Sequence, residues 1–426
     1  MRRFLDGFGE LARPKDVSLI SATHGVNEFF SIAIPPVIPF LVADLDITYA
    51  EAGLLLTAFF VMYSVFQLPA GMVGDRVGKK PVLVGGMVGM AGGIFLASTA
   101  DTYATLVAAQ VVAGIGGSTF HPTGMSLISD FETGTTEGKA MGVFGFGGTL
   151  GTAAAPLVVG GVAGLVDWRV ALAVAAVLGL VVTVAFAALF TEPDRSSDDG
   201  PDGNSPLGID SDDDPDDAVE HDGGRPDAVR RLSRRVADAT RVPLTPGVAM
   251  LMLLTALLSM QTRAVMTFTT SYVFTGTGGT VATANVVFFT MLVAGGVSSL
   301  AAGDLADRFD RSRLGVTASV LTATLLVATF ALVEGSDGLS GSLLFASLVV
   351  AFFAVGVAMY GSLPVKNALI SGYAEREFSG GLFGVTQTTG ALGSATGPAL
   401  VGYLATEFGV TVAYPMVAVV SLLVAV

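Results

Sequence analysis

Long apolar stretches recur along the whole chain and are separated by short polar segments. A helix needs about 20 mainly apolar residues to span a membrane. Runs of this kind predict twelve spans, six on each side of a longer polar region. We place them near residues 17–42, 48–70, 81–99, 103–128, 138–165, 169–190, 247–272, 281–302, 314–334, 343–370, 380–405 and 409–426. The pattern therefore predicts an all-α membrane protein of 12 transmembrane helices.

Composition places most of the chain in lipid. Apolar residues make up 52% and charged residues 14%, which is unlike an ordinary soluble protein. The net charge is −14, and acids concentrate between Glu192 and Asp238 among Pro, Gly and Ser. We therefore expect a disordered, solvated linker at residues 191–245 and no nucleic-acid partner. The acidity also suits a halophile, whose concentrated salt screens self-repulsion, although an unusual linker alone would explain it.

Lys and Arg residues near the ends of the spans predict the orientation. They gather on one side of the membrane: Arg2, Arg3, Arg13, Lys15, Arg76, Lys79, Lys80, Arg230, Arg231, Arg234, Arg235, Arg308, Arg311 and Arg313. The other side carries acids and almost no cations: Asp44, Asp46, Glu51, Asp101, Glu334, Asp337 and Glu407. The positive-inside rule then puts both termini and the linker in the cytoplasm.

A short charged element occurs once in each half of the chain. A glycine precedes an Asp-Arg pair by four residues, at Gly71, Asp75 and Arg76 and again at Gly303, Asp307 and Arg308. This spacing puts the glycine and the acid on one helical face and fits a turn at the membrane surface. A shift of 242 residues also superimposes Pro122 on Pro364 and Pro156 on Pro398. We therefore expect residues 1–190 and 246–426 to be parallel six-helix repeats.

The fuller copy of this element, Gly71 to Lys80, resembles the signature of the major facilitator superfamily of secondary transporters. The resemblance covers nearly the whole chain. It implies two six-helix bundles around a midplane cavity that opens alternately to each side. It also implies that the two copies act as cytoplasmic gates, which assigns gating to Gly71, Asp75, Arg76, Gly303, Asp307 and Arg308.

Three further stretches resemble the fosmidomycin-resistance type of efflux transporter within that superfamily. They are His24 to Phe30 running into Pro35-Pro36, Phe120-His121-Pro122, and Gly147 to Gly151 followed by Ala155-Pro156. One position departs from the proton-coupled antiporters of the superfamily, many of which have an arginine on helix four. This chain has Gln110 there, which places that route of proton coupling in question.

Ionisable side chains inside spans are costly, so each is a functional candidate. Glu28 lies about eleven residues into the first span, near the midplane at about 1.5 Å per residue. Loss of hydration penalises the charged form there, so we expect Glu28 to carry a coupling proton. His24 lies on the same face four residues earlier and forms either a relay or a purely structural pair with Glu28. Asn27 is expected either in the cavity or in a hydrogen bond between helices.

Two other interior side chains have open interpretations. His121 precedes Pro122, which can break the fourth helix and expose backbone to substrate. His121 therefore either contacts substrate or a proton, or packs against the freed carbonyl group. Arg263 is the most interior cation and either attracts an anionic substrate or pairs internally with an acid such as Glu28.

Glycines and prolines in spans five and eleven predict close packing and bending of helices, at Gly151, Pro156, Gly393 and Pro398. The sequence shows no phosphate-binding loop, no Ser-His-acid set and no cluster with clear metal-ligand spacing. The absence of cysteine excludes disulfides and thiolate sites. We therefore expect no catalytic residues, no metal and no cofactor.

These features together predict a secondary transporter rather than an enzyme. We expect a monomer in the cell membrane that exports a small, anionic or amphiphilic molecule by proton-coupled alternating access. The alternative is uptake by proton or sodium symport, and a distant one is a transporter-like receptor or sensor. The partners are then the substrate, the coupling ion and the lipid bilayer.

Overall fold

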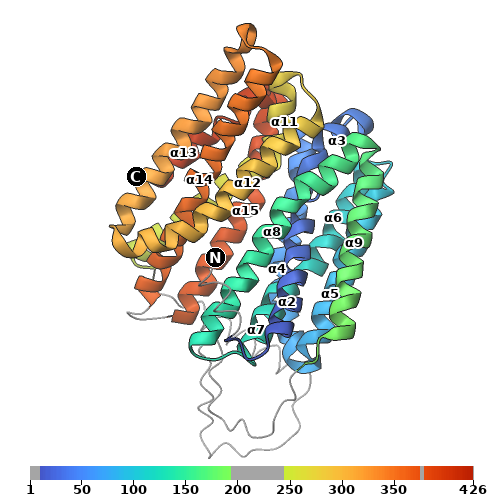
Figure 1. The fold of residues 1–426 in the computed structure, drawn as a ribbon, viewed down its shortest axis with the longest axis vertical. Coiled ribbons are helices and arrows are strands. Elements are labelled where there is room, and N and C mark those ends of the chain that lie inside the picture. The colour runs from blue at the N-terminus through green and yellow to red at the C-terminus, as the bar shows by residue number, and fades with distance from the viewer. Residues whose placement is uncertain (1–9, 193–243, 375–378, 426) are drawn as a thin grey trace, which may run out of the picture.

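The computed structural model describes residues 10–192, 244–374 and 379–425, which form helices joined by short turns (Figure 1). The first half contains α2 (Pro14–Ser31), η1 (Pro35–Val37), α3 (Ile38–Leu45), α4 (Tyr49–Val77), α5 (Lys79–Ser98), α6 (Tyr103–Gly117), α7 (Phe120–Ser129), α8 (Thr135–Leu165) and α9 (Trp168–Leu189). The second half contains α11 (Pro246–Thr277), α12 (Val281–Arg308), α13 (Arg311–Glu334), η2 (Ser336–Gly338), α14 (Gly341–Ala374), α15 (Ser379–Phe408), α16 (Val410–Ala413) and α17 (Val417–Ala425).

The helices confirm the predicted membrane protein. Within the described residues, ten helical segments are long and apolar enough to cross a membrane. They correspond to the first ten predicted spans, and α15 and α16–α17 follow at the positions of the last two. The predicted linker, residues 191–245, lies almost entirely outside the described residues.

Three predicted spans are not continuous, and each is interrupted at proline. The first breaks between α2 and α3 at Pro35-Pro36, and the last breaks between α16 and α17 at Pro415. The fourth breaks between α6 and α7, where Pro122 has no N–H to donate to the carbonyl group of Ser118. The sequence indicated that Pro122 can break the fourth helix, whereas it gave no indication of the interruptions in the first and last spans.

The two halves lie side by side, with the first coloured blue to green and the second yellow to red in Figure 1. Their main contacts are α4 with α15 and α8 with α12. Thr57 of α4 donates to the carbonyl oxygen of Ala395 at 2.5 Å, and Thr406 of α15 accepts from the amide of Ala50 at 2.9 Å. These contacts lie toward the end of the bundle where α4 begins.

Close packing of α2 on α8 positions buried polar side chains in the first half. A Cβ atom added to Gly151 would lie 1.8 Å from the carbonyl oxygen of Gly25, so only glycine permits this approach. The same packing brings α8 against His24, because a Cβ atom on Gly148 would lie 2.5 Å from its imidazole ring. Glycines thus let the backbone of α8 form one wall around His24.

Candidate functional site

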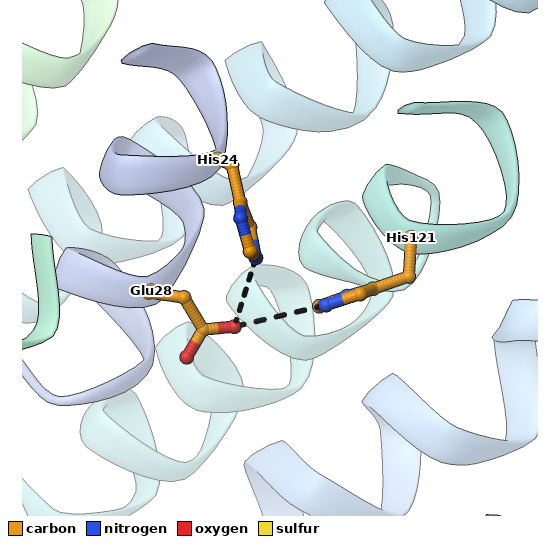
Figure 2. A group of neighbouring side chains, drawn as sticks. All are labelled: His24, Glu28 and His121. Carbon is orange, nitrogen blue, oxygen red and sulfur yellow. Dashed lines mark ion pairs between the residues drawn. The ribbon is translucent and has the colours of Figure 1, made fainter. Parts of the chain in front are cut away.

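Three ionisable side chains converge in the first half of the chain. His24 and Glu28 lie one turn apart on α2, and His121 reaches them from the first turn of α7 (Figure 2). The Nε2 atoms of His24 and His121 lie 3.8 and 3.9 Å from Oε1 of Glu28. The structure therefore joins the expected His24–Glu28 pair to a third residue from a distant span.

His24 is held rigidly by α8 and α7. Its ring stacks on Phe144 at 3.8 Å between centroids and on Phe120 at 5.4 Å. Its Nδ1 atom lies 2.8 Å from the carbonyl oxygen of Phe144. A carbonyl oxygen can only accept, so Nδ1 carries the proton and, in the neutral ring, Nε2 presents a lone pair to Glu28.

A second hydrogen-bond chain fixes His121 in the same way. Asn27 is fully buried and donates from Nδ2 to the carbonyl oxygen of Gly117 at 3.2 Å, where α6 ends. Its Oδ1 atom therefore accepts from the hydroxyl of Tyr63, at 3.1 Å. The Tyr63 oxygen in turn lies 2.6 Å from Nδ1 of His121 and must accept from it. The neutral His121 ring thus also presents a lone pair on Nε2 to Glu28.

The cluster has a simple electrostatic requirement. In its fully deprotonated form, two imidazole lone pairs and one carboxylate face one another with no proton between them, which is unfavourable in a site of reduced hydration. A bound proton or another cation removes this repulsion. The Glu28 side chain is 19% exposed and that of His121 33%, so neither is completely covered by protein atoms. The arrangement can therefore take up and release a cation.

Arg263 approaches the first half from α11. Its guanidinium carbon lies 4.5 Å from the centroid of the Phe60 ring on α4, a cation–π contact between the two halves. The sequence left open an internal ion pair with Glu28 or an anion-attracting role. In the described structure Arg263 makes this aromatic contact, and a guanidinium group that contacts a ring through its face can still donate N–H groups to an anion.

The remaining predicted residues divide between packing and the gates. Gln110 is buried on α6, and in the described structure its Nε2 atom has no hydrogen-bond partner. Gly393 packs against α11, since a Cβ atom there would lie 2.1 Å from the carbonyl oxygen of Ala256. Pro156 and Pro398 lie inside α8 and α15, which continue through them.

At the first predicted gate, Asp75 and Arg76 are exposed at the end of α4, and Gly71 faces Pro122 of α7. An ion pair at this turn joins Lys79 to Asp130 at 2.6 Å, and both residues belong to the first half. At the second predicted gate, Gly303, Asp307 and Arg308 lie within α12, but the surroundings of these residues are outside the described structure.

Sequence reasoning missed Tyr63 and Phe144, which orient the two histidines. A signal for Tyr63 was present, because it lies about as far along α4 as Glu28 lies along α2. Aromatic residues are common in membrane helices, however, so a single tyrosine does not stand out.

These observations agree with the comparison to known proteins. A family model described as Major Facilitator Superfamily matches residues 20–274 and 251–426. The chain belongs to this superfamily, and it is a multi-pass membrane transporter rather than an enzyme. The comparisons do not show the fosmidomycin-resistance branch that three motifs suggested.

Relatives whose names state a transported molecule match about a third of this chain, and the match covers about a third of their own length. The probable L-galactonate transporter of Escherichia coli (strain K12) is 26% identical over 147 residues, which cover 34% of this chain and 32% of the relative. The probable nitrate transporter NarT of Staphylococcus aureus (strain JH9) is 28% identical over 136 residues, 32% of this chain and 34% of the relative.

Solved structures match over almost the whole chain. A bacterial homolog of the human lysosomal transporter Spinster, in an inward-facing and occupied conformation, has a TM-score of 0.73 at 15% identity. The match covers 96% of this chain and 94% of that one. The inward-facing, unoccupied structure gives a TM-score of 0.71 at 16% identity, covering 97% and 92%. At this identity the likeness shows the fold.

Proposed function

We propose that this protein is a secondary active transporter that exports a small molecule by alternating access, coupled to protons at Glu28. The observation that carries this proposal is the convergence of His24, Glu28 and His121, in which two imidazoles with fixed tautomers present lone pairs to one carboxylate. Such a group holds a proton in one state and releases it when neighbouring helices move, because hydration and the distances between charges change together.

The substrate is proposed to be a small anion or an amphiphile with an anionic group. Arg263 supplies an interior positive charge whose described contact is an aromatic face rather than a carboxylate. The names of two relatives, a galactonate and a nitrate transporter, both refer to anions. Uptake by proton or sodium symport is the second candidate, favoured by Gln110 at the position where many antiporters carry an arginine.

We further propose that residues 191–245 tether the two repeats on the cytoplasmic side. The helices that flank this segment are α9, which ends at Leu189, and α11, which begins at Pro246. The acidic composition of the tether fits a segment that stays in water.

Transport in sealed vesicles tests the proton site. Glutamine mimics the permanently protonated form of Glu28, so Glu28→Gln should abolish transport driven by a pH gradient while leaving exchange of substrate across the membrane. Nitrate and galactonate are the first probes. Asp101→Asn is the matched control, because it also replaces an acid by its amide. Asp101 is exposed and pairs with Arg169, and neither residue belongs to the cluster. Gradient-driven transport at the wild-type rate in Glu28→Gln would remove Glu28 from the mechanism.

A further inference from the structure

The side chains of the same cluster have the chemistry of a metal site. We propose that His24, Glu28 and His121 bind a divalent transition-metal ion, with Zn²⁺ as the probe. One ligand atom from each residue lies within 4.8 Å of the other two. The inference goes beyond the proposed transport function and does not depend on proton coupling, since it concerns only the ligand geometry.

Both histidines are oriented as metal ligands are. A histidine that binds a metal through one nitrogen almost always donates its other N–H to a carbonyl, carboxylate or similar acceptor. His24 donates from Nδ1 to the Phe144 carbonyl, and His121 donates from Nδ1 to Tyr63. Each Nε2 is therefore free to bind and is turned toward Glu28.

The strongest single indication is the unsatisfied nitrogen of His24. This residue is 7% exposed, and its Nε2 atom has no hydrogen-bond partner within the described residues. Instead it lies 3.8 Å from Glu28 Oε1, beyond hydrogen-bond distance. A buried lone pair without a donor is costly, and a cation placed between these atoms would satisfy it.

The two nitrogen-to-carboxylate distances need only a small contraction. Bonds of about 2 Å in a tetrahedral zinc site place two ligand atoms roughly 3.3 Å apart. The Nε2 to Oε1 distances of 3.8 and 3.9 Å thus exceed that spacing by about half an ångström. His24 is held by its contacts with two aromatic rings, so the adjustment falls to the flexible Glu28 side chain and to His121, which follows the break between α6 and α7.

The donor set selects the class of metal. Two imidazole nitrogens and one carboxylate suit zinc and its first-row neighbours, whereas Ca²⁺ and Mg²⁺ prefer oxygen ligands. Three protein ligands leave a fourth position, which water or an anion can occupy.

The chain is well suited to a direct test. It has no cysteine and three histidines, of which His221 lies outside the cluster. In the His221→Ala background, every imidazole bound to Zn²⁺ must come from His24 or His121. We expect calorimetry of the purified protein to show one Zn²⁺ per chain in the presence of excess Mg²⁺, and X-ray absorption to show two imidazole ligands.

Variants separate the site from acidic residues elsewhere. His24→Asn and His121→Asn each keep an amide donor near the Nδ1 position but remove Nε2, and Glu28→Gln removes the carboxylate. Each should weaken Zn²⁺ binding at least tenfold, while Asp101→Asn should leave it unchanged. Melting temperature without metal and size-exclusion profiles establish that each variant is folded.

Two results would overturn the inference. One is Zn²⁺ binding of wild-type strength in the double variant His24→Asn/His121→Asn, which would locate the ion on carboxylates such as those of the linker. The other is an X-ray absorption spectrum of the His221→Ala protein with oxygen ligands alone, and this result needs no further variant. Neither bears on proton-coupled transport, which is measured separately in vesicles.

Discussion

The contact between Arg263 and Phe60 allows the effect of a positive charge to be tested separately from the effect of aromatic packing. The guanidinium group and the ring come from different halves of the molecule and lie 4.5 Å apart. A cation–π contact contributes about 0.5–2 kcal/mol, depending on its exposure to water. Either side chain can therefore be changed to remove this contact, but only a change at Arg263 also removes the positive charge.

We predict that Arg263→Ala abolishes stabilisation by anionic substrates, whereas Phe60→Leu retains it. The physical reason is that an anion needs the charge and not the ring that supports it. Thermal unfolding of the purified proteins with and without a panel of small anions measures the effect. Equal ligand-induced shifts in wild type and Arg263→Ala would rule out Arg263 as the anion-binding group.

The sequence could predict contacts within this cluster only for residues that lie close together along the chain. The helical spacing of His24 and Glu28 placed them on one face, and the structure confirms this. No spacing rule connects them to His121, which lies on another helix, so the three-residue cluster emerges only from packing. The expectation that the sequence holds no clear metal-ligand cluster rested on local spacing, and it overlooked this long-range contact.

At the scale of helices, glycines decide which surfaces approach closely. Gly151 and Gly161 both lie on α8, and sequence alone does not distinguish them. A Cβ atom on Gly151 would lie 1.8 Å from the backbone oxygen of Gly25, whereas one on Gly161 meets nothing within 4 Å. Only the first position therefore requires glycine for packing.

Gly151→Ala is predicted to lower the free energy of unfolding by about 1–3 kcal/mol, the usual cost of overpacking. Gly161→Ala should leave it unchanged or raise it by up to about 1 kcal/mol, because alanine favours helix more than glycine does. Unfolding in detergent measures both variants under the same conditions. Equal stability of the two variants would show that α2 can move away from α8 without cost.

Prolines mark where helices within the predicted spans are interrupted, but not every proline interrupts its helix. Apolar length alone gives continuous spans, and ten segments of the described structure have the expected length and composition. It does not show that Pro35-Pro36 and Pro415 interrupt helices while Pro156 and Pro398 remain inside them. A helix continues through a proline when neighbouring groups satisfy the carbonyl group that the proline leaves without its N–H partner. This depends on the packing of other helices, which the local sequence does not show.

For the whole molecule, the described contacts between the halves define one closed end. A Cβ atom on Gly53 of α4 would lie 2.3 Å from the carbonyl oxygen of Pro398 on α15. Asn285 of α12 donates to the carbonyl oxygen of Pro36 at 3.0 Å. The charge distribution in the loops predicts that this end faces outward.

Alternating access requires these contacts to separate in every transport cycle. Ala50 and Thr406 form a contact between the halves, with 2.9 Å from the amide nitrogen to Oγ1, and the chain has no cysteine of its own. We predict that Ala50→Cys/Thr406→Cys forms a cross-link under mild oxidation and that the cross-link stops transport, because α4 can no longer leave α15. Reduction should restore the rate, and each single-cysteine variant should remain active under both conditions. A cross-linked protein that transports at the full rate would show that this end stays closed throughout the cycle, and the substrate would then have to move by another route.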